Sequence, residues 1–323
     1  MHMKQIIPLL TALLLPLSAQ EENTKEAIIE SLMQADNVAQ LNSAIAAAKK
    51  ANLPQQMIVE ARFMYHINQD DLASLAALSP ALAKELPTYS PDNTLIFGTK
   101  EDYESVVYYT KALGALEKKD IPLFKKHITE AFWLSPAHGA QFAPHIEEVR
   151  LQQAMAKTTL DLTRELTDQK NLATKTTLAK LTGDSPAILL HFWSPWVDGS
   201  MFFMPEYAKI SKHLIENKIP TASILLAGNS EARKNASDFL QETKDPTPGS
   251  WLIDHEKKSL ATTLRIARFP STVLVKKDGS ILFNGDPGNP DLWEQLTKFN
   301  PDIKQPPIPI VPENSIKKSD PGE

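Results

Sequence analysis

The residues whose side chains are best suited to take part in a chemical reaction lie between His191 and Ser200. The stretch 192–207 reads FWSPWVDGSMFFMPEY, and it joins a short apolar run at 187–191 to an apolar segment that is compatible with a helix. A serine hydroxyl beside a histidine can act as a nucleophile that a base activates, so Ser200 and His191 form a candidate hydrolytic pair. No acid is obviously placed to orient the imidazole, and a core histidine satisfied by a hydrogen bond is the favoured interpretation. A non-redox enzyme that uses Ser200 and His191 stays the alternative.

The same stretch resembles the active-site turn of thioredoxin-like proteins of the envelope redoxin type, which reads FWA-x-WC-x-x-C-x-x-E-M-P-E. Val197 and Ser200 stand where that family has its two cysteines, and Phe203 stands where it has its first glutamate. The resemblance therefore implies a thioredoxin-like fold whose reactive residues have been replaced. The residues that match the pattern are Phe192, Trp193, Trp196, Met204, Pro205 and Glu206.

Cysteine is absent from the sequence. Thiol–disulfide exchange requires a thiolate that attacks a sulfur atom and a second thiol that resolves the mixed disulfide. Val197 has no titratable group. The start of a helix can lower the pKa of a thiol enough for it to ionise, but the pKa of the Ser200 hydroxyl is far too high for the same effect to ionise it. We therefore exclude thiol–disulfide oxidoreductase activity for this chain.

The resemblance leaves a binding surface at the turn. In the family a cis-proline faces the active-site turn, and Pro270 occupies that place. Thioredoxin-like folds bind extended peptides across the turn beside this proline, and that mode needs no cysteine. The resemblance thus implies a binding or scaffold module for a protein or peptide partner, without a cofactor. The candidate binding residues are Trp196, Asp198, Gly199, Phe202, Phe203, Phe269 and Pro270.

Four consecutive apolar residues follow the turn, from Met201 to Met204. Each residue of a helix turns by about 100°, so a helix packed on a sheet cannot bury all four side chains. Either the amino-terminal domain or a partner covers the rest, and a chaperone-like holdase that uses this patch is a second alternative. We expect Asp198 to shape the turn with Gly199 or to cap the helix that follows.

Short strands alternate with helices over residues 158–299, which favours an α/β domain with a central mixed sheet and flanking helices. The pair Asp278-Gly279 predicts a hairpin turn. The order of elements resembles the thioredoxin-like core, preceded by the amino-terminal extension that envelope redoxins carry, here at 158–162 and 176–181. Strands are expected at 187–193, 221–227, 251–254, 271–275 and 281–285, and helices at 201–217, 230–242, 258–266 and from 290 onward.

Residues 22–157 predict an all-α domain of antiparallel helical hairpins, because apolar residues recur at helical spacing between short polar turns. One pair of helices, at 103–118 and 121–134, resembles a tetratricopeptide repeat, although several signature positions are missing. A generic helical bundle is the alternative. The residues that carry this resemblance are Tyr108, Ala112, Ala131 and Pro136.

The two ends of the chain differ from both domains. Residues 1–19 combine Lys4 with an apolar run and a small-residue ending, a pattern typical of a secretory signal peptide. We therefore expect a periplasmic or secreted protein without an integral membrane anchor after cleavage. Residues 300–323 are rich in proline and predict an extended or disordered tail.

Charge and composition narrow the remaining function classes. The net charge of −5 gives no electrostatic reason to expect a nucleic-acid partner. The histidines are scattered, and His138 and His145 lie seven residues apart on a predicted helix. Helix surfaces carry such groups routinely, so we expect no metal site there, and this region is the weaker location for an enzyme site.

Overall fold

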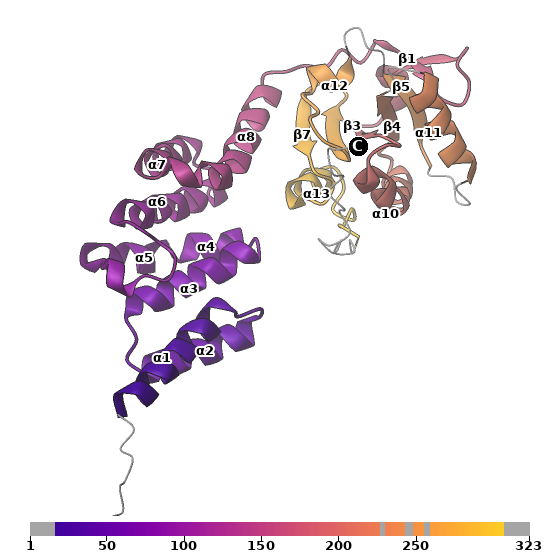
Figure 1. Ribbon diagram of the computed structural model, residues 1–323. Helices are drawn as coiled ribbons and strands as arrows, with labels where there is room; N and C mark the ends of the chain where they lie inside the picture. The colour runs from indigo at the N-terminus through magenta and orange to yellow at the C-terminus, as the bar shows by residue number, and fades with distance from the viewer. Residues whose placement is uncertain (1–16, 227–229, 243–247, 255–258, 307–323) are drawn as a thin grey trace, which may run out of the picture. The chain divides into compact units, whose positions relative to one another are not determined.

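The protein folds into two compact units that divide between Ile146 and Glu147, within helix α8 (Gly139–Met155). The structure is a computed structural model, and Figure 1 shows its all-α first unit in indigo to magenta. The sequence predicts the boundary at residue 157. The division falls earlier because Met155 packs into the core of the second unit. The described residues are 17–226, 230–242, 248–254 and 259–306.

The first unit consists of helices joined by short turns. Polar side chains cap helix starts: Asn37 accepts a hydrogen bond from the backbone N–H of Gln40, and Asp71 accepts one from that of Ser74. The predicted all-α region is confirmed, while the resemblance to tetratricopeptide repeats stays a prediction. The helices are α1 (Leu17–Met33), α2 (Val38–Lys50), α3 (Gln55–Asn68), α4 (Leu72–Ala77), α5 (Ser79–Glu85), α6 (Lys100–Glu117) and α7 (Ile121–Leu134), with 3₁₀ turns at Leu86–Thr88, Pro91–Asn93 and Pro136–His138.

Helices α6 and α7 pack closely against each other. Ala112 and Ala131 are completely buried, and the hydroxyl of Ser105 donates a 2.7 Å hydrogen bond to the backbone carbonyl of Ala131. Small side chains on both helices permit this approach, since a larger residue at either alanine would hold the backbones apart.

A buried carboxylate fixes the segment between α5 and α6. Glu60 on α3 is fully buried, and one of its oxygens accepts hydrogen bonds from the Thr94 hydroxyl (2.9 Å) and from the backbone N–H groups of Leu95 (2.6 Å) and Ile96 (3.2 Å). The other oxygen accepts a bond from the amide of Gln56, whose side chain also pairs with the backbone of Ser90. The segment thus satisfies its polar backbone groups through α3.

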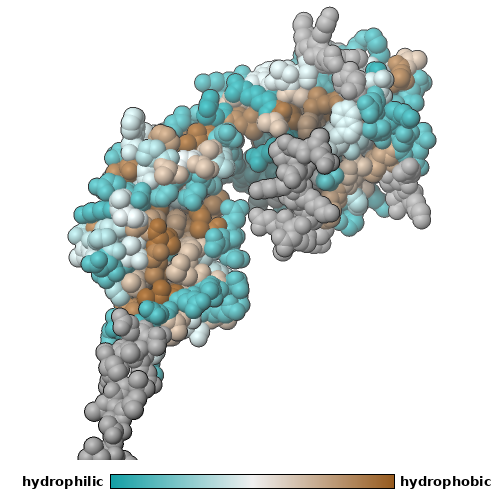
Figure 2. All heavy atoms as spheres, viewed as in Figure 1, coloured by the Kyte–Doolittle hydropathy of each residue, from teal (hydrophilic) through white to brown (hydrophobic). Residues whose placement is uncertain are grey.

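The first unit also exposes several large apolar side chains. Trp133 at the end of α7 is 75% exposed, and Phe132 beside it is 43% exposed. Figure 2 shows apolar residues gathered in bands between hydrophilic ones on the visible face of this unit. Among the described residues, none of the helices combines the length and the apolar character needed to cross a membrane.

The second unit contains one seven-stranded mixed sheet in the order β2-β1-β5-β4-β3-β6-β7. The interior strand β3 runs parallel to β4 and antiparallel to β6, and β7 follows β6 through a hairpin. Gly279 in that hairpin has a φ of 82°, as the predicted Asp278-Gly279 turn requires. The strands are β1 (Glu165–Asp168), β2 (Lys175–Thr177), β3 (Ala187–Trp193), β4 (Thr221–Leu226), β5 (Ser250–Asp254), β6 (Ser271–Lys276) and β7 (Ile281–Gly285).

Helices cover both faces of this sheet, and β3 is buried on both sides. Alternate residues of a strand point to opposite faces, so Leu189 and Trp193 join one core cluster, while Leu190 and Phe192 join the other. The first cluster includes residues of α10, α11 and α13, and the second includes residues of α9 and α12. The helices are α9 (Leu178–Thr182), α10 (Asp198–Glu216), α11 (Ser230–Glu242), α12 (Leu260–Thr263) and α13 (Pro290–Thr297).

The sheet order and the helix placement are those of a thioredoxin-like fold, which confirms the predicted fold class. Two local predictions differ from the structure. The predicted extension forms a hairpin of β1 and β2 at slightly different positions, and most of the predicted second segment is the short helix α9. The helix expected at 258–266 is limited to the four residues of α12, within the part of that range that is described.

The ends of the chain fall partly outside the described residues. Of the predicted signal peptide, only residues 17–19 lie in a described element, at the start of α1. The first residues of the predicted tail at 300–323 belong to the fold. Ile303 is completely buried in the core cluster that contains α10 and α13, so the chain is still part of the fold at that point. The rest of the predicted tail, 307–323, lies outside the described residues.

Candidate functional site

The turn that resembles the redoxin active site connects the end of β3 to the start of α10. The backbone N–H groups of Ser200 and Met201 donate to the carbonyl oxygen of Val197, at 2.9 and 3.2 Å. Val197 is therefore the residue that precedes the helix, and it provides no side-chain cap. The predicted capping role of Asp198 is wrong, because Asp198 is already the first helical residue. Its negative charge still suits the positive end of the helix dipole.

Ser200 has a structural role in this turn. Its side chain is completely buried, and its hydroxyl accepts a 3.3 Å hydrogen bond from the backbone N–H of Ser194. The hydroxyl of Ser194 in turn accepts a bond from the backbone N–H of Trp196. Ser194 is not among the predicted site residues, although a serine at the end of an otherwise apolar strand is a usable signal for such a contact.

His191 lies in the middle of the sheet, beneath α10. It pairs in register with Ser223 of β4 and Thr272 of β6. The imidazole stacks on the ring of Tyr207, with centroids 3.9 Å apart and planes 27° apart, and the ring of Phe203 lies 6.0 Å away. Burial lowers the pKa of His191 to about 3, so the imidazole is neutral at ordinary pH.

The side chains of His191 and Ser200 do not form a hydrogen bond with each other. Neither ring nitrogen of His191 has a hydrogen-bond partner among the described residues. The proposed hydrolytic pair is therefore not formed. The expectation of a core histidine is right about burial and wrong about the hydrogen bond, because the neighbours of the ring are mainly aromatic and Tyr207 contacts its face.

Tyr207 completes this buried cluster. Burial raises the pKa of Tyr207 to about 12, while the nearby hydroxyls of Ser223 and Thr221 act in the opposite direction. The phenol and the imidazole are thus both neutral. A neutral stack beneath α10 supports the helix that carries the turn, and it offers no charged group for acid–base work at neutral pH.

The predicted proline lies next to the turn. The peptide bond between Phe269 and Pro270 is cis. A Cβ atom placed on Gly199 would lie 3.7 Å from the carbonyl oxygen of Phe269 and 3.8 Å from Cδ of Pro270. Glycine therefore leaves a narrow space between the start of α10 and the Phe269–Pro270 segment, and a larger side chain would fill it.

Two large aromatic side chains are exposed on this side of the unit. Trp196 is 54% exposed and Phe202 is 52% exposed. Phe202 follows Gly199 by three residues and therefore lies on the same side of α10. We call the surface formed by Trp196, Gly199, Phe202, Phe269 and Pro270 the turn surface.

The four-residue apolar patch predicted after the turn is largely covered. Met204 is buried, and Met201 and Phe203 are half-buried against the core cluster. Only Phe202 of the four is mainly exposed, in agreement with the expectation that α10 cannot bury them all. Phe203 is a packing residue, because its ring lies against those of His191 and Tyr207.

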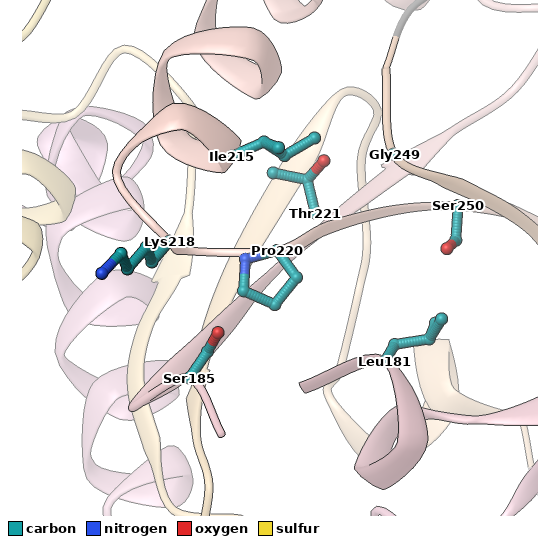
Figure 3. Close-up of a pocket in the computed structure, with 8 residues that line it drawn as sticks. All are labelled: Leu181, Ser185, Ile215, Lys218, Pro220, Thr221, Gly249 and Ser250. Carbon is teal, nitrogen blue, oxygen red and sulfur yellow. The ribbon is translucent and has the colours of Figure 1, made fainter. Parts of the chain in front are cut away.

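A separate pocket of about 280 Å³ lies at the opposite end of α10. Its residues come from α9 and the segment that follows it, from the end of α10, and from the starts of β4 and β5. Figure 3 shows the Lys218 side chain leading away from Pro220 and Thr221. None of the predicted site residues lines it. The lining residues are Leu181, Ser185, Ile215, Lys218, Pro220, Thr221, Gly249 and Ser250.

His138 and His145 belong to the aromatic packing of the first unit. Nε2 of His145 lies 3.0 Å from the hydroxyl of Tyr109, and burial lowers the pKa of His145. The ring of His138 packs edge-on against Phe97 and Phe142. Among the described residues, no three histidine, aspartate or glutamate side chains are grouped so that they could hold a metal ion.

No protein-family model and no curated protein matches the sequence. Solved structures do match the second unit. The exposed lipoprotein thioredoxin Etrx1 of Streptococcus pneumoniae is 16% identical with a TM-score of 0.35, over 42% of this chain and 98% of that one. The thioredoxin domain of a thiol-disulfide oxidoreductase from Bacteroides vulgatus is 17% identical with a TM-score of 0.35, over 44% and 97%. A secreted disulfide oxidoreductase of Mycobacterium tuberculosis is 20% identical with a TM-score of 0.31, over 39% and 86%.

The assignment of the fold rests on the sheet order and on the position of Pro270 beside the turn. The second unit has a thioredoxin-like fold, and Val197 and Ser200 stand at the two turn positions at which the sequence resemblance leads us to expect cysteines. The turn presents the exposed aromatic side chains of Trp196 and Phe202 and contains no thiol.

Proposed function

We propose that this is an exported, redox-inactive thioredoxin-like protein that binds a protein or peptide partner across the turn surface. The observation that carries the proposal is the exposure of Trp196 and Phe202 beside the narrow space between Gly199 and Phe269. Neither aromatic side chain is needed to fill the core, since each leaves about half of its surface in solvent.

Exposed aromatic residues next to an open backbone suit the binding of an extended peptide. Tryptophan and other large aromatic residues dominate the energetics of many interfaces, because they bury a large apolar area at a small cost in side-chain entropy. The backbone of a bound segment would run beside Phe269, and its side chains would contact Trp196 and Phe202.

The proposal of export rests on the amino-terminal sequence. Residues 1–19 carry the basic start, the apolar run and the small-residue ending of a secretory signal peptide. A periplasmic or secreted location follows from that proposal. Mass spectrometry of the amino terminus after expression in a bacterial host would test it, since export predicts a mature protein that begins near Gln20.

A random-peptide selection tests the binding proposal. The bait is the full chain and, in parallel, a chain that ends at Pro306 and so retains every described residue. Peptides that bind either bait should lose at least tenfold in affinity when Trp196 or Phe202 is replaced by alanine, which corresponds to about 1.4 kcal/mol. Trp133→Ala is the matched control, because Trp133 is an exposed tryptophan of the first unit. Equal binding to Trp196→Ala, Phe202→Ala and the parent chain would refute the proposal.

A chaperone-like holdase is the second candidate, and the exposure of Phe202 favours it. Phe203→Glu is a poor test because Phe203 packs against the core. Phe202→Glu changes an exposed side chain and should leave the fold intact. If the protein is a holdase, the parent chain suppresses the aggregation of heat-denatured citrate synthase and Phe202→Glu does not. Equal suppression by both would remove this candidate.

A further inference from the structure

The pocket at the far end of α10 from the turn has no part in the proposed function. It lies where three strands of the sheet begin: Ser185 precedes β3 by two residues, Pro220 directly precedes β4, and Gly249 directly precedes β5. Strands β3 and β5 both run parallel to β4, so the three strands begin at the same end of the sheet. The turn follows β3 at the opposite end. A ligand in this pocket therefore leaves the turn surface free.

Buried hydroxyl groups hold one wall of the pocket in place. The side chains of Ser211 and Thr221 are buried, and their hydroxyl oxygens lie 2.5 Å apart. The Ser211 hydroxyl also donates a 2.8 Å hydrogen bond to the carbonyl oxygen of Pro248, which fastens the chain before β5 to α10. Gly249 has a φ of 99°, and a Cβ atom there would collide with Oγ1 of Thr221. The wall is thus formed before a ligand binds, which lowers the cost of binding.

The rest of the lining combines apolar side chains with hydrogen-bond donors. Figure 3 shows Pro220 in the middle of the lining residues, with Leu181 and Ser250 on one side and Ser185 and Lys218 on the other. Within the part of the chain that the structure describes, the hydroxyls of Ser185 and Ser250 form no hydrogen bond, and the Lys218 ammonium forms no ion pair. These donors and one positive charge are therefore available to a ligand.

The positive charge has no acidic competitor in the lining, as far as the residues are described. Asp184, next to the lining serine, lies 3.5 Å from the ammonium of Lys277, and Glu216 is exposed and does not line the pocket. The last carbonyl groups of α10 would favour a cation, but those of residues 213–215 accept hydrogen bonds from the backbone N–H groups of residues 217–219. The free polar side chains of the pocket therefore suit a ligand that accepts hydrogen bonds and carries a negative charge.

We propose that this pocket binds a small free carboxylic acid with a short branched apolar chain. The carboxylate accepts a hydrogen bond from Ser185 and pairs with the ammonium of Lys218, because charge-assisted hydrogen bonds are the stronger kind. The Lys218 side chain points away from Pro220 in Figure 3, and its flexible four-carbon stem lets the ammonium turn over the mouth of the pocket. The apolar chain of the ligand packs against Leu181 and Ile215.

The size of the pocket limits the ligand. Its volume of about 280 Å³ lies just below the range of pockets that hold drug-sized molecules. An acid of roughly seven non-hydrogen atoms fits such a space with its charged end at the mouth. Isovalerate is an acid of this size and shape.

Isovalerate and isovaleramide together test the need for a negative charge. The two probes have the same shape, and only isovalerate carries a carboxylate. The full chain, labelled with ¹⁵N, is titrated with each probe, and the backbone N–H signals of Gly249 and Ser250 report binding. Isovalerate should shift both signals with a dissociation constant of about 1 mM, and isovaleramide should bind at least tenfold more weakly. The signal of Gly199 at the turn should not move.

Lys218→Asn removes the positive charge with little strain. Lys218 has a φ of 62°, and asparagine tolerates this left-handed backbone conformation. The variant should bind isovalerate at least tenfold more weakly than the parent chain. Lys212→Asn is the matched control, because Lys212 is an exposed lysine of α10 that does not line the pocket. This control should bind isovalerate as the parent chain does.

The remaining outcomes contradict the inference. Unmoved Gly249 and Ser250 signals at about 20 mM isovalerate would overturn it. Equal affinities for the acid and the amide, or for the parent chain and Lys218→Asn, would do the same. The peptide acetyl-Gly-Gly-Val ends in the same branched apolar group and a carboxylate. If it binds more tightly than isovalerate, the carboxylate comes from a chain terminus and the assignment to a free acid is wrong.

Discussion

His191 shows how a single buried side chain can link the stability of the second unit to pH. The ring stacks on Tyr207, and the imidazolium form would lie in the sheet core, where burial lowers the pKa from 6.5 to about 3. The folded state therefore favours the neutral ring. The contribution of the buried, neutral imidazole to the free energy of unfolding is fully present above pH 6.5. It is lost progressively as the pH falls from 6.5 toward 3.

We predict that the second unit loses about 2 kcal/mol of unfolding free energy between pH 7.5 and pH 5 through His191 alone, because the unfolded chain binds the proton and the folded chain does not. Urea unfolding followed by the fluorescence of the buried Trp193 and Trp251 measures this change. His191→Leu removes the titrating group, so its loss over the same interval should be smaller by that amount. Equal losses in the two proteins would contradict the burial of an unpaired imidazole.

Positions 197 and 200 provide a residue-scale test of the alignment with redoxins. Val197 is half-buried at the helix start, and Ser200 follows one turn later. We predict that Val197→Cys with Ser200→Cys gains insulin-reducing activity with dithiothreitol as the electron donor, because a helix start lowers the pKa of a thiol. Val197→Cys alone should gain none. A folded double variant without dithiol chemistry would count against the alignment.

The residues at the turn could be placed from the sequence, but their contacts could not. The apolar run before the turn is enough to predict that β3 is buried, and the motif is enough to predict Pro270 beside the turn. The stack of His191 on Tyr207 depends on the rotation of α10 about its axis, and local sequence does not determine that rotation. The hydrogen bond from Ser194 to Ser200 likewise depends on the path of the turn.

At the scale of elements, α3 holds the irregular segment between α5 and α6 through Glu60. The carboxylate accepts four hydrogen bonds while it is fully buried. We predict that Glu60→Ala destabilises the first unit by about 3 kcal/mol, since it leaves buried donors without an acceptor. Thermal unfolding followed by circular dichroism measures the effect.

Glu130 on α7 is the matched control, because it is an exposed glutamate of the same unit. Glu130→Ala should change the unfolding free energy by less than about 0.5 kcal/mol. An equally small effect of Glu60→Ala would show that the segment is held by other contacts. The acceptor lies 34 residues earlier in the chain than Thr94, beyond the reach of any local pattern.

For the whole molecule, the sequence is sufficient to predict a helical part followed by a part with a thioredoxin-like fold. The exact boundary and the end of the fold depend on tertiary packing. Met155 and Ile303 have no local signal that assigns them to the second unit, yet each fills a gap in one of its core clusters.

We propose that the turn surface, which contains no thiol, is a binding surface. The most direct measurement compares the affinity of a selected peptide for Gly199→Ala and Gly199→Leu in the chain that ends at Pro306. The Cβ of alanine fits at 3.7 Å from the carbonyl oxygen of Phe269, whereas the leucine side chain fills the space beside it. We predict that Gly199→Ala retains the parent affinity and that Gly199→Leu, folded by circular dichroism, loses at least tenfold. Equal affinity of the two variants would contradict binding across the turn.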